Sequence, residues 1–118
     1  LSDDTILITE TKDEPFKTAC DKAVEYFKSI KTSDGKEYKI VRIPGWYQDG
    51  TWYTYTNSLI INNVAIVPVY SLNEYANKIA VDVYIKAMPS IKVKTIFSDY
   101  SISSGGSIHC VTQQIHKP

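Results

Sequence analysis

The spacing of apolar residues changes from a strand pattern to a helix pattern within the first 30 residues. Residues 5–9 form a short run rich in β-branched side chains, which predicts a buried strand. In the segment that follows, apolar residues recur every three or four positions and so share one face of a predicted helix: Phe16, Cys20, Ala23, Val24, Phe27 and Ile30. Asp13 and Pro15 are typical of a helix start, with Asp13 as the cap. Residues 32–35 form a polar turn whose glycine suits a helix end.

The middle of the chain predicts strands on either side of an aromatic loop. Residues 37–44 read as a strand that ends at Pro44-Gly45. Residues 46–55 are aromatic and punctuated by glycine, which predicts a loop that either covers a cationic ligand or packs against a neighbouring part of the fold. Two further strands, 56–61 and 64–69, flank Asn62-Asn63, and this pair suits a hairpin turn because asparagine tolerates positive φ.

A second amphipathic helix is predicted after residue 70. Ser71 is the expected cap, and Glu74 three residues later completes a capping box. The helix ends before Pro89, because the residue before a proline disfavours the α conformation. Its apolar stripe contains Leu72, Tyr75, Ala76, Ile79, Ala80, Val83, Tyr84 and Ala87. Residues 91–97 alternate as a strand, residues 98–106 form a polar loop, and residues 108–115 form the last strand.

These elements contain a repeat. The order strand, strand, helix, strand occurs once complete, over residues 57–97, and a partial copy precedes it. Residues 38–44 would close the first copy as residues 91–97 close the second. A repeat that is cut at its left edge indicates that the chain is a piece of something larger. A generic α/β sandwich is the simpler alternative.

Composition narrows the possible functions. The 118 residues include 13 basic and 13 acidic side chains, so no net charge favours nucleic acid or an acidic membrane as a partner. The apolar runs are too short to span a bilayer. The two cysteines, Cys20 and Cys110, make neither a disulfide framework nor a zinc site, and no metal or cofactor is expected. Cys20 lies on the inner face of the first helix and is predicted to belong to the core.

Cys110 lies in the most distinctive stretch of the chain. The run Gly105-Gly106-Ser107-Ile108-His109-Cys110-Val111-Thr112-Gln113-Gln114 joins a glycine pair to a short apolar strand. Glycines let the backbone approach a ligand closely. A cysteine on an apolar strand is by itself usually a small buried hydrophobe, so the functional interpretation depends on the surrounding residues. His109 cannot serve the neighbouring thiol directly, because consecutive strand residues point to opposite faces.

This run resembles the C-terminal active-site strand of the agmatine deiminases and the bacterial-type peptidylarginine deiminases. Residues 53–60 and 67–69 are similar to a second block of the same family, and residues 86–89 resemble the peptidylarginine deiminases in particular. The resemblance implies an α/β fold that is the C-terminal part of a pentein-type five-bladed α/β-propeller built from ββαβ units. Residues 1–56 would be the end of one blade and a loop, and residues 57–118 the last blade and the nucleophile strand.

The resemblance also implies roles for particular residues. Cys110 would be the nucleophile that forms a covalent thiouronium intermediate, and Asn57 would form hydrogen bonds in the substrate pocket. Gly105 and Gly106 would form the loop that admits substrate to the thiol. The family's general acid/base histidine and its substrate-binding carboxylates lie upstream of the part that matches. We therefore expect this chain alone to be inactive, to associate with the missing N-terminal blades and, as a further alternative, to form a homo-oligomer.

Two substrates remain open. The leading interpretation is hydrolysis of agmatine to N-carbamoylputrescine and ammonia, which the cysteine run favours. The second is conversion of peptidyl-arginine to citrulline, which the Asn57 block and residues 87–89 favour. A cytoplasmic location would accompany the first activity, and a secreted or periplasmic location the second. An amidinotransferase fits the cysteine run less well. From a different class, the chain could be a non-catalytic α/β binding or assembly module with a vestigial cysteine.

Overall fold

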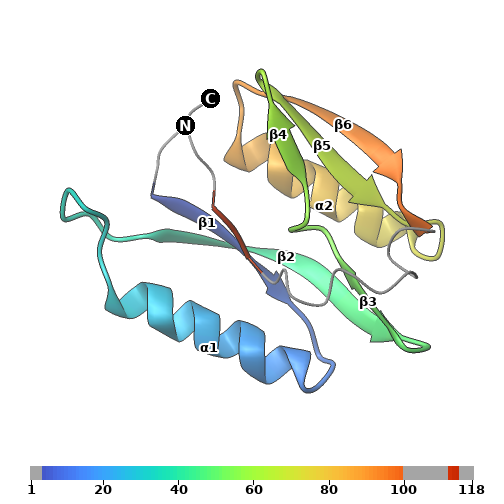
Figure 1. Cartoon of the computed structure of the whole chain (residues 1–118), viewed down its shortest axis with the longest axis horizontal. Coiled ribbons are helices and arrows are strands. Elements are labelled where there is room, and N and C mark those ends of the chain that lie inside the picture. The colour runs from blue at the N-terminus through green and yellow to red at the C-terminus, as the bar shows by residue number, and fades with distance from the viewer. Residues whose placement is uncertain (1–3, 100–111, 115–118) are drawn as a thin grey trace.

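The computed structural model describes residues 4–99 and the backbone of residues 112–114, which form two sheets and two helices (Figure 1). The first sheet, called sheet A, has the strand order β3-β2-β1-β7, and the second, called sheet B, has the order β4-β5-β6. The strands are β1 (Thr5–Glu10), β2 (Lys39–Gln48), β3 (Thr51–Thr54), β4 (Leu59–Ile61), β5 (Val64–Val69), β6 (Lys92–Phe97) and β7 (Thr112–Gln114). The helices are α1 (Phe16–Ser29) and α2 (Glu74–Ala87).

The two sheets repeat one arrangement. Each contains a strand, a helix and a second strand parallel to the first: β1-α1-β2 in sheet A and β5-α2-β6 in sheet B. In each sheet an antiparallel strand pairs with the first of these, β7 with β1 and β4 with β5. The partial copy predicted from the sequence is therefore completed by β7, which comes from the opposite end of the described chain (Figure 1).

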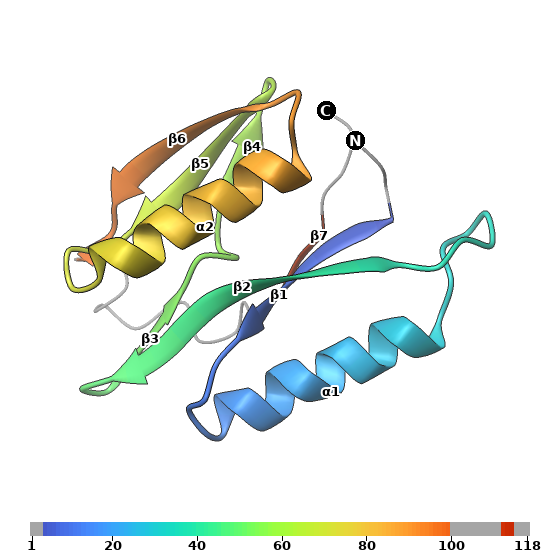
Figure 2. The same cartoon turned by 180° about the vertical axis from the view of Figure 1, so that it is seen from behind.

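Helix α1 covers one face of sheet A, and α2 covers the other. Because successive strand residues point to opposite faces, Ile6 and Ile8 of β1 pack on the α1 side, whereas Leu7 belongs to the core on the α2 side. Helix α2 also contacts β5 and β6, so it lies between the two sheets (Figures 1 and 2). Neither helix is long and apolar enough to cross a membrane, as far as the chain is described.

The prediction that Cys20 belongs to the core is confirmed. Its side chain is fully buried between α1 and sheet A, together with Val24 and Trp52. Burial raises the pKa of the Cys20 thiol above its ordinary value, because the thiolate would lose its hydration. Cys20 is therefore a small core residue and a poor nucleophile.

The prediction of a loop over residues 46–55 is wrong, because this segment is a hairpin. Strand β2 continues through Pro44 and Gly45, turns at Asp49-Gly50, where both residues have positive φ, and returns as β3. The sheet tolerates Pro44 because its partner Glu10 is the last residue of β1, and pairing with β3 begins only at Gly45. The second predicted hairpin is confirmed, since Asn62 and Asn63 have φ values of 48° and 66° between β4 and β5.

Three of the aromatic side chains of residues 46–55 are buried, whereas Tyr47 is exposed. Trp52, Tyr53 and Tyr55 are 1%, 9% and 0% exposed, so these rings are not available to a ligand. Tyr53 stacks on Trp46 with ring centroids 5.0 Å apart, and both rings meet Tyr70 edge-on. Of the two interpretations of this segment, packing within the fold is the one that describes these three residues.

Both helices begin as predicted to within a few residues, but with different caps. Asn73 rather than Ser71 caps α2, and its side-chain Oδ1 accepts a hydrogen bond from the Ala76 backbone N–H at 2.9 Å. The Asp13 carboxylate does not cap α1, because it accepts a hydrogen bond from the Tyr47 backbone N–H in the hairpin. The apolar stripe of α2 is wider than its buried face: Ala76, Ala80 and Tyr84 are buried, whereas Leu72, Tyr75 and Ile79 are exposed.

Candidate functional site

Of the predicted site residues, Asn57 lies in the described part of the chain, in the connection between β3 and β4. Cys110, Gly105 and Gly106 lie outside the described residues. Strand β7 begins at Thr112, two residues after Cys110 in the sequence, and Thr112 pairs with Ile8 near the carboxyl end of β1. The described part of the predicted site therefore consists of Asn57, the residues that contact its segment, and the end of β1 that pairs with β7.

Asn57 is exposed, although the residues before it are buried. Tyr55 and Thr56 are 0% and 1% exposed. The residues of positive φ that the structure describes do not include Asn57, so the left-handed conformation that explains many turn asparagines does not apply. Within residues 4–99 its side chain forms no hydrogen bond, so it caps no helix and closes no turn in that part of the chain. The Asn57 amide is presented outward from a buried backbone.

A chain of buried hydroxyl groups runs from β1 to the residue before Asn57. Thr9 Oγ1 lies 3.3 Å from Thr54 Oγ1, which lies 3.0 Å from Thr56 Oγ1. The Thr56 backbone N–H also donates to Thr54 Oγ1 at 3.3 Å. All three threonines are buried. The carboxyl end of β1, beside the start of β7, is thereby connected to the segment that carries Asn57.

Gly45 makes the contact between Thr9 and Thr54 possible. These residues lie on β1 and β3, which pair with opposite edges of β2, so their side chains meet across β2 at Gly45. A Cβ atom at Gly45 would lie 2.4 Å from Thr9 Cγ2 and 3.1 Å from the Tyr53 carbonyl oxygen. The absence of a side chain on β2 at this position leaves room for the hydroxyl chain.

We expect Gly45→Ala to lower the free energy of unfolding by about 1–3 kcal/mol, because the new methyl group displaces Thr9 or the backbone of β3. Urea denaturation of the variant measures the change. Gly50→Ala is the comparison: Gly50 has a φ of 80° but no atom within 4 Å of a built Cβ, so its cost of about 1 kcal/mol comes from the backbone alone. A Gly45→Ala protein as stable as the original would contradict the close approach.

Two buried tyrosines hold the backbone around Asn57. The Tyr70 hydroxyl donates a hydrogen bond to the Thr54 carbonyl oxygen. The Tyr84 hydroxyl donates to the Tyr55 carbonyl oxygen at 2.6 Å and lies 2.9 Å from Ser58 Oγ. A phenol has one hydrogen, so Ser58 is the donor in the second of these bonds. Burial raises the pKa of both tyrosines well above its ordinary value, so both phenols keep the hydrogens that they donate.

The side chain of Asn77, on α2, also forms hydrogen bonds with Tyr55 and Tyr70. Its Oδ1 accepts hydrogen bonds from the Tyr55 hydroxyl at 2.6 Å and from the Tyr70 backbone N–H at 3.0 Å. Its Nδ2 donates to the Tyr70 carbonyl oxygen at 2.6 Å. From the sequence, Tyr84 is only a core position of the second helix and Asn77 a polar one. The available signal is that a buried phenol needs a hydrogen-bond partner, but the sequence does not say which.

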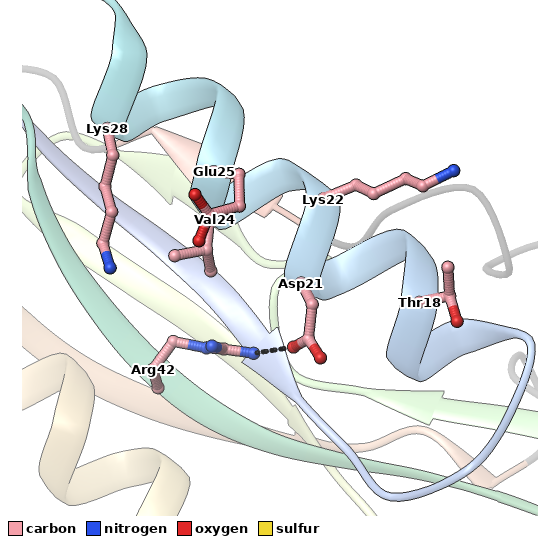
Figure 3. Close-up of a pocket in the computed structure, with 7 residues that line it drawn as sticks. All are labelled: Thr18, Asp21, Lys22, Val24, Glu25, Lys28 and Arg42. Carbon is pink, nitrogen blue, oxygen red and sulfur yellow. Dashed lines mark hydrogen bonds and ion pairs between the residues drawn. The ribbon is translucent and has the colours of Figure 1, made fainter.

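A groove of about 490 Å³ lies between α1 and β2 (Figure 3), and Asn57 is not among the residues that line it. The Arg42 guanidinium at its base donates to the carbonyl oxygens of Ile8 and Thr9 and lies 3.4 Å from the Asp21 carboxylate. Hydrogen bonds from Lys17 and then Arg42 lower the pKa of Asp21. These charges therefore tie α1 to the end of β1. Among the described residues, no group of three or more His, Cys, Asp and Glu side chains could hold a metal ion.

Comparisons with known proteins give consistent results. A sequence model of the family described as Porphyromonas-type peptidyl-arginine deiminase matches residues 1–116. A Legionella pneumophila protein, provisionally named an agmatine deiminase, is 26% identical over 113 residues, which are 92% of this chain and 32% of that protein. The chain thus spans about a third of the length of this relative.

Solved structures of named deiminases share the fold. A Porphyromonas gingivalis protein, provisionally named an arginine deiminase, superposes with a TM-score of 0.74 and 27% identity over 96% of this chain and 35% of its own. The agmatine deiminase of Enterococcus faecalis has the same TM-score of 0.74 over 94% of this chain and 36% of its own. Its sequence identity is 21%, so this second likeness shows the fold alone.

Proposed function

Because the chain belongs to the Porphyromonas-type peptidyl-arginine deiminase family, we propose that it is part of a cysteine-dependent deiminase that hydrolyses the guanidine group of agmatine to N-carbamoylputrescine and ammonia. The match over residues 1–116, which includes both Asn57 and Cys110, is the observation that carries this proposal. Agmatine is preferred because the aligned Legionella pneumophila protein has that provisional name.

The predicted fold class, part of a pentein-type α/β-propeller, is confirmed by the structural comparisons. Two successive repeats, β7-β1-α1-β2 and β4-β5-α2-β6, are visible in the chain itself. The blade assignment stays a proposal: residues 1–56 end one blade, and residues 57–118 form the last blade and the nucleophile strand.

In the proposed reaction, Cys110 acts as a thiolate. Its sulfur attacks the guanidinium carbon, and the tetrahedral adduct expels ammonia after a general acid outside this chain protonates the leaving nitrogen. The S–C bond remains in a thiouronium intermediate. Water then attacks the same carbon, the S–C bond breaks, and the ureido product leaves with the thiol restored. A guanidinium ion is a delocalised and strongly hydrated cation, so this attack requires a thiolate in a pocket that excludes water.

Asn57 is proposed to form hydrogen bonds with the substrate. Its amide offers one acceptor oxygen and two donor hydrogens. Two features of the structure support this role: the exposed amide has no partner within residues 4–99, and the backbone on either side is hydrogen-bonded to buried tyrosines. Gly105 and Gly106 stay the proposed loop that admits substrate to the thiol.

The arrangement of β7, β1 and β3 supports one shared site for Cys110 and Asn57. In the sequence, Cys110 comes two residues before Thr112, the first residue of β7. Thr112 pairs with Ile8, and the next residue, Thr9, begins the hydroxyl chain that ends at Thr56. Strand β7, which follows Cys110 in the sequence, and the segment that carries Asn57 are thus linked through the end of β1.

Peptidyl-arginine is the second candidate substrate, favoured by the name of the family that the chain matches. The test is formation of ureido product by the complete protein that carries this chain, with agmatine and a blocked peptidyl-arginine assayed side by side. We expect turnover of agmatine. Turnover of the peptide instead would assign the second activity. A folded protein that turns over neither substrate would overturn both, and would favour a non-catalytic assembly module.

A further inference from the structure

The backbone around Asn57 is held by a side chain from a distant helix. We propose that Tyr84 is a positioning residue of the deiminase site, which sets the location of the Asn57 amide through hydrogen bonds on both sides of it. This inference rests on the proposed function, because it assumes that Asn57 binds substrate. Tyr84 lies on α2 and is fully buried, so it does not itself reach a ligand from this position.

The hydrogen bonds of Tyr84 bracket Asn57. Its hydroxyl donates to the Tyr55 carbonyl oxygen at 2.6 Å, two residues before Asn57, and bonds with Ser58 Oγ at 2.9 Å, one residue after it. The Tyr55 carbonyl oxygen and Ser58 Oγ thus both bond to the Tyr84 hydroxyl oxygen. The four-residue segment from Tyr55 to Ser58 is closed into a loop, and its one exposed member is Asn57.

The part of α2 that carries Tyr84 is tightly packed. Helix α2 lies between the two sheets, and the residues that flank Tyr84 on its inner face, Ala80 and Met88, are fully buried. The phenol oxygen cannot move from this position without disturbing the core that α2 shares with both sheets. Tyr70 differs, because the bond that its hydroxyl forms within residues 4–99 goes to the Thr54 carbonyl oxygen, before the loop begins. Of these two tyrosines, Tyr84 is therefore the one that bridges Asn57.

Loss of the Tyr84 hydroxyl should release the loop while keeping the ring packed. We expect Tyr84→Phe to reduce kcat/KM for the preferred substrate about tenfold, mainly through KM, because a misplaced binding group weakens substrate contacts. Tyr75→Phe, at a position 76% exposed on the same helix, is the matched control and should leave the kinetics unchanged.

A double-mutant cycle separates positioning from a purely structural role. If Tyr84 acts through Asn57, Tyr84→Phe reduces kcat/KM in the original protein but has less than a twofold effect in an Asn57→Ala background, whereas its effect on thermal stability is the same in both. The measurement uses the complete protein. Equal kinetic losses in the two backgrounds, or an Asn57→Ala protein with unchanged KM, would overturn the inference and leave the proposed function intact. Absence of turnover in the original protein would overturn the proposed function, and this inference with it.

Discussion

Cys110→Ala in the complete protein is expected to abolish formation of the ureido product, with a loss on the order of 10³-fold or more. The proposed reaction passes through a bond between the Cys110 sulfur and the guanidinium carbon, and alanine has no atom that can form it. The substituted side chain is small, so the fold should be kept. A discontinuous assay for ureido product, with unfolding curves for both proteins, measures activity and stability independently.

Cys20→Ala is the matched control, since Cys20 is the other cysteine of the sequence. It is fully buried against sheet A, and its pKa is raised by burial, so its removal should change stability by about 1 kcal/mol and leave turnover intact. A haloacetamidine, whose cation imitates the substrate, should label Cys110 of the complete protein faster than iodoacetamide does. Full activity in Cys110→Ala, or equal and slow labelling by both reagents, would exclude the proposed nucleophile.

The isolated 118-residue chain is expected to show no turnover of either substrate. It spans about a third of the aligned Legionella pneumophila relative. Its two histidines are His109, which comes directly before the proposed nucleophile in the sequence, and His116 near the end of the sequence. We therefore expect the acid/base histidine and the substrate-binding carboxylates to come from outside this chain. Turnover by the isolated chain at the rate of the complete protein would refute this expectation.

The isolated chain is also expected to self-associate through sheet B. Sheet A has a helix on each face, whereas within the described residues sheet B has α2 on one face only. On the other face Leu59, Ile61 and Ile96 are 54%, 49% and 57% exposed. Such an apolar surface favours association. Light scattering should show oligomers that Leu59→Lys with Ile96→Lys reduces, and a monomer at all concentrations would contradict this.

Much of the fold could be predicted from the sequence, because apolar spacing and turn residues depend on interactions between residues that are close in the sequence. Apolar spacing showed which face of each helix is buried, and Cys20 is buried as that spacing requires. Asn62-Asn63 specified a tight turn through the backbone conformations that asparagine tolerates. The exposed Leu72 and Tyr75 mark the limit of this reasoning, since an apolar stripe shows what can be buried and not whether a neighbour covers it.

The candidate site needed the tertiary structure. The sequence named Asn57 and Cys110 through a family resemblance, but it could not show that β7 pairs with β1. Pairing between strands at opposite ends of the described chain depends on the whole fold. The sequence likewise predicted a strand end at Pro44 and Gly45. The strand continues there because β1 ends opposite Pro44 and pairing with β3 begins at Gly45, and the tertiary structure is needed to show this. A buried phenol such as that of Tyr84 must find a hydrogen-bond partner, and only the packing of α2 between two sheets decided that the partners bracket Asn57.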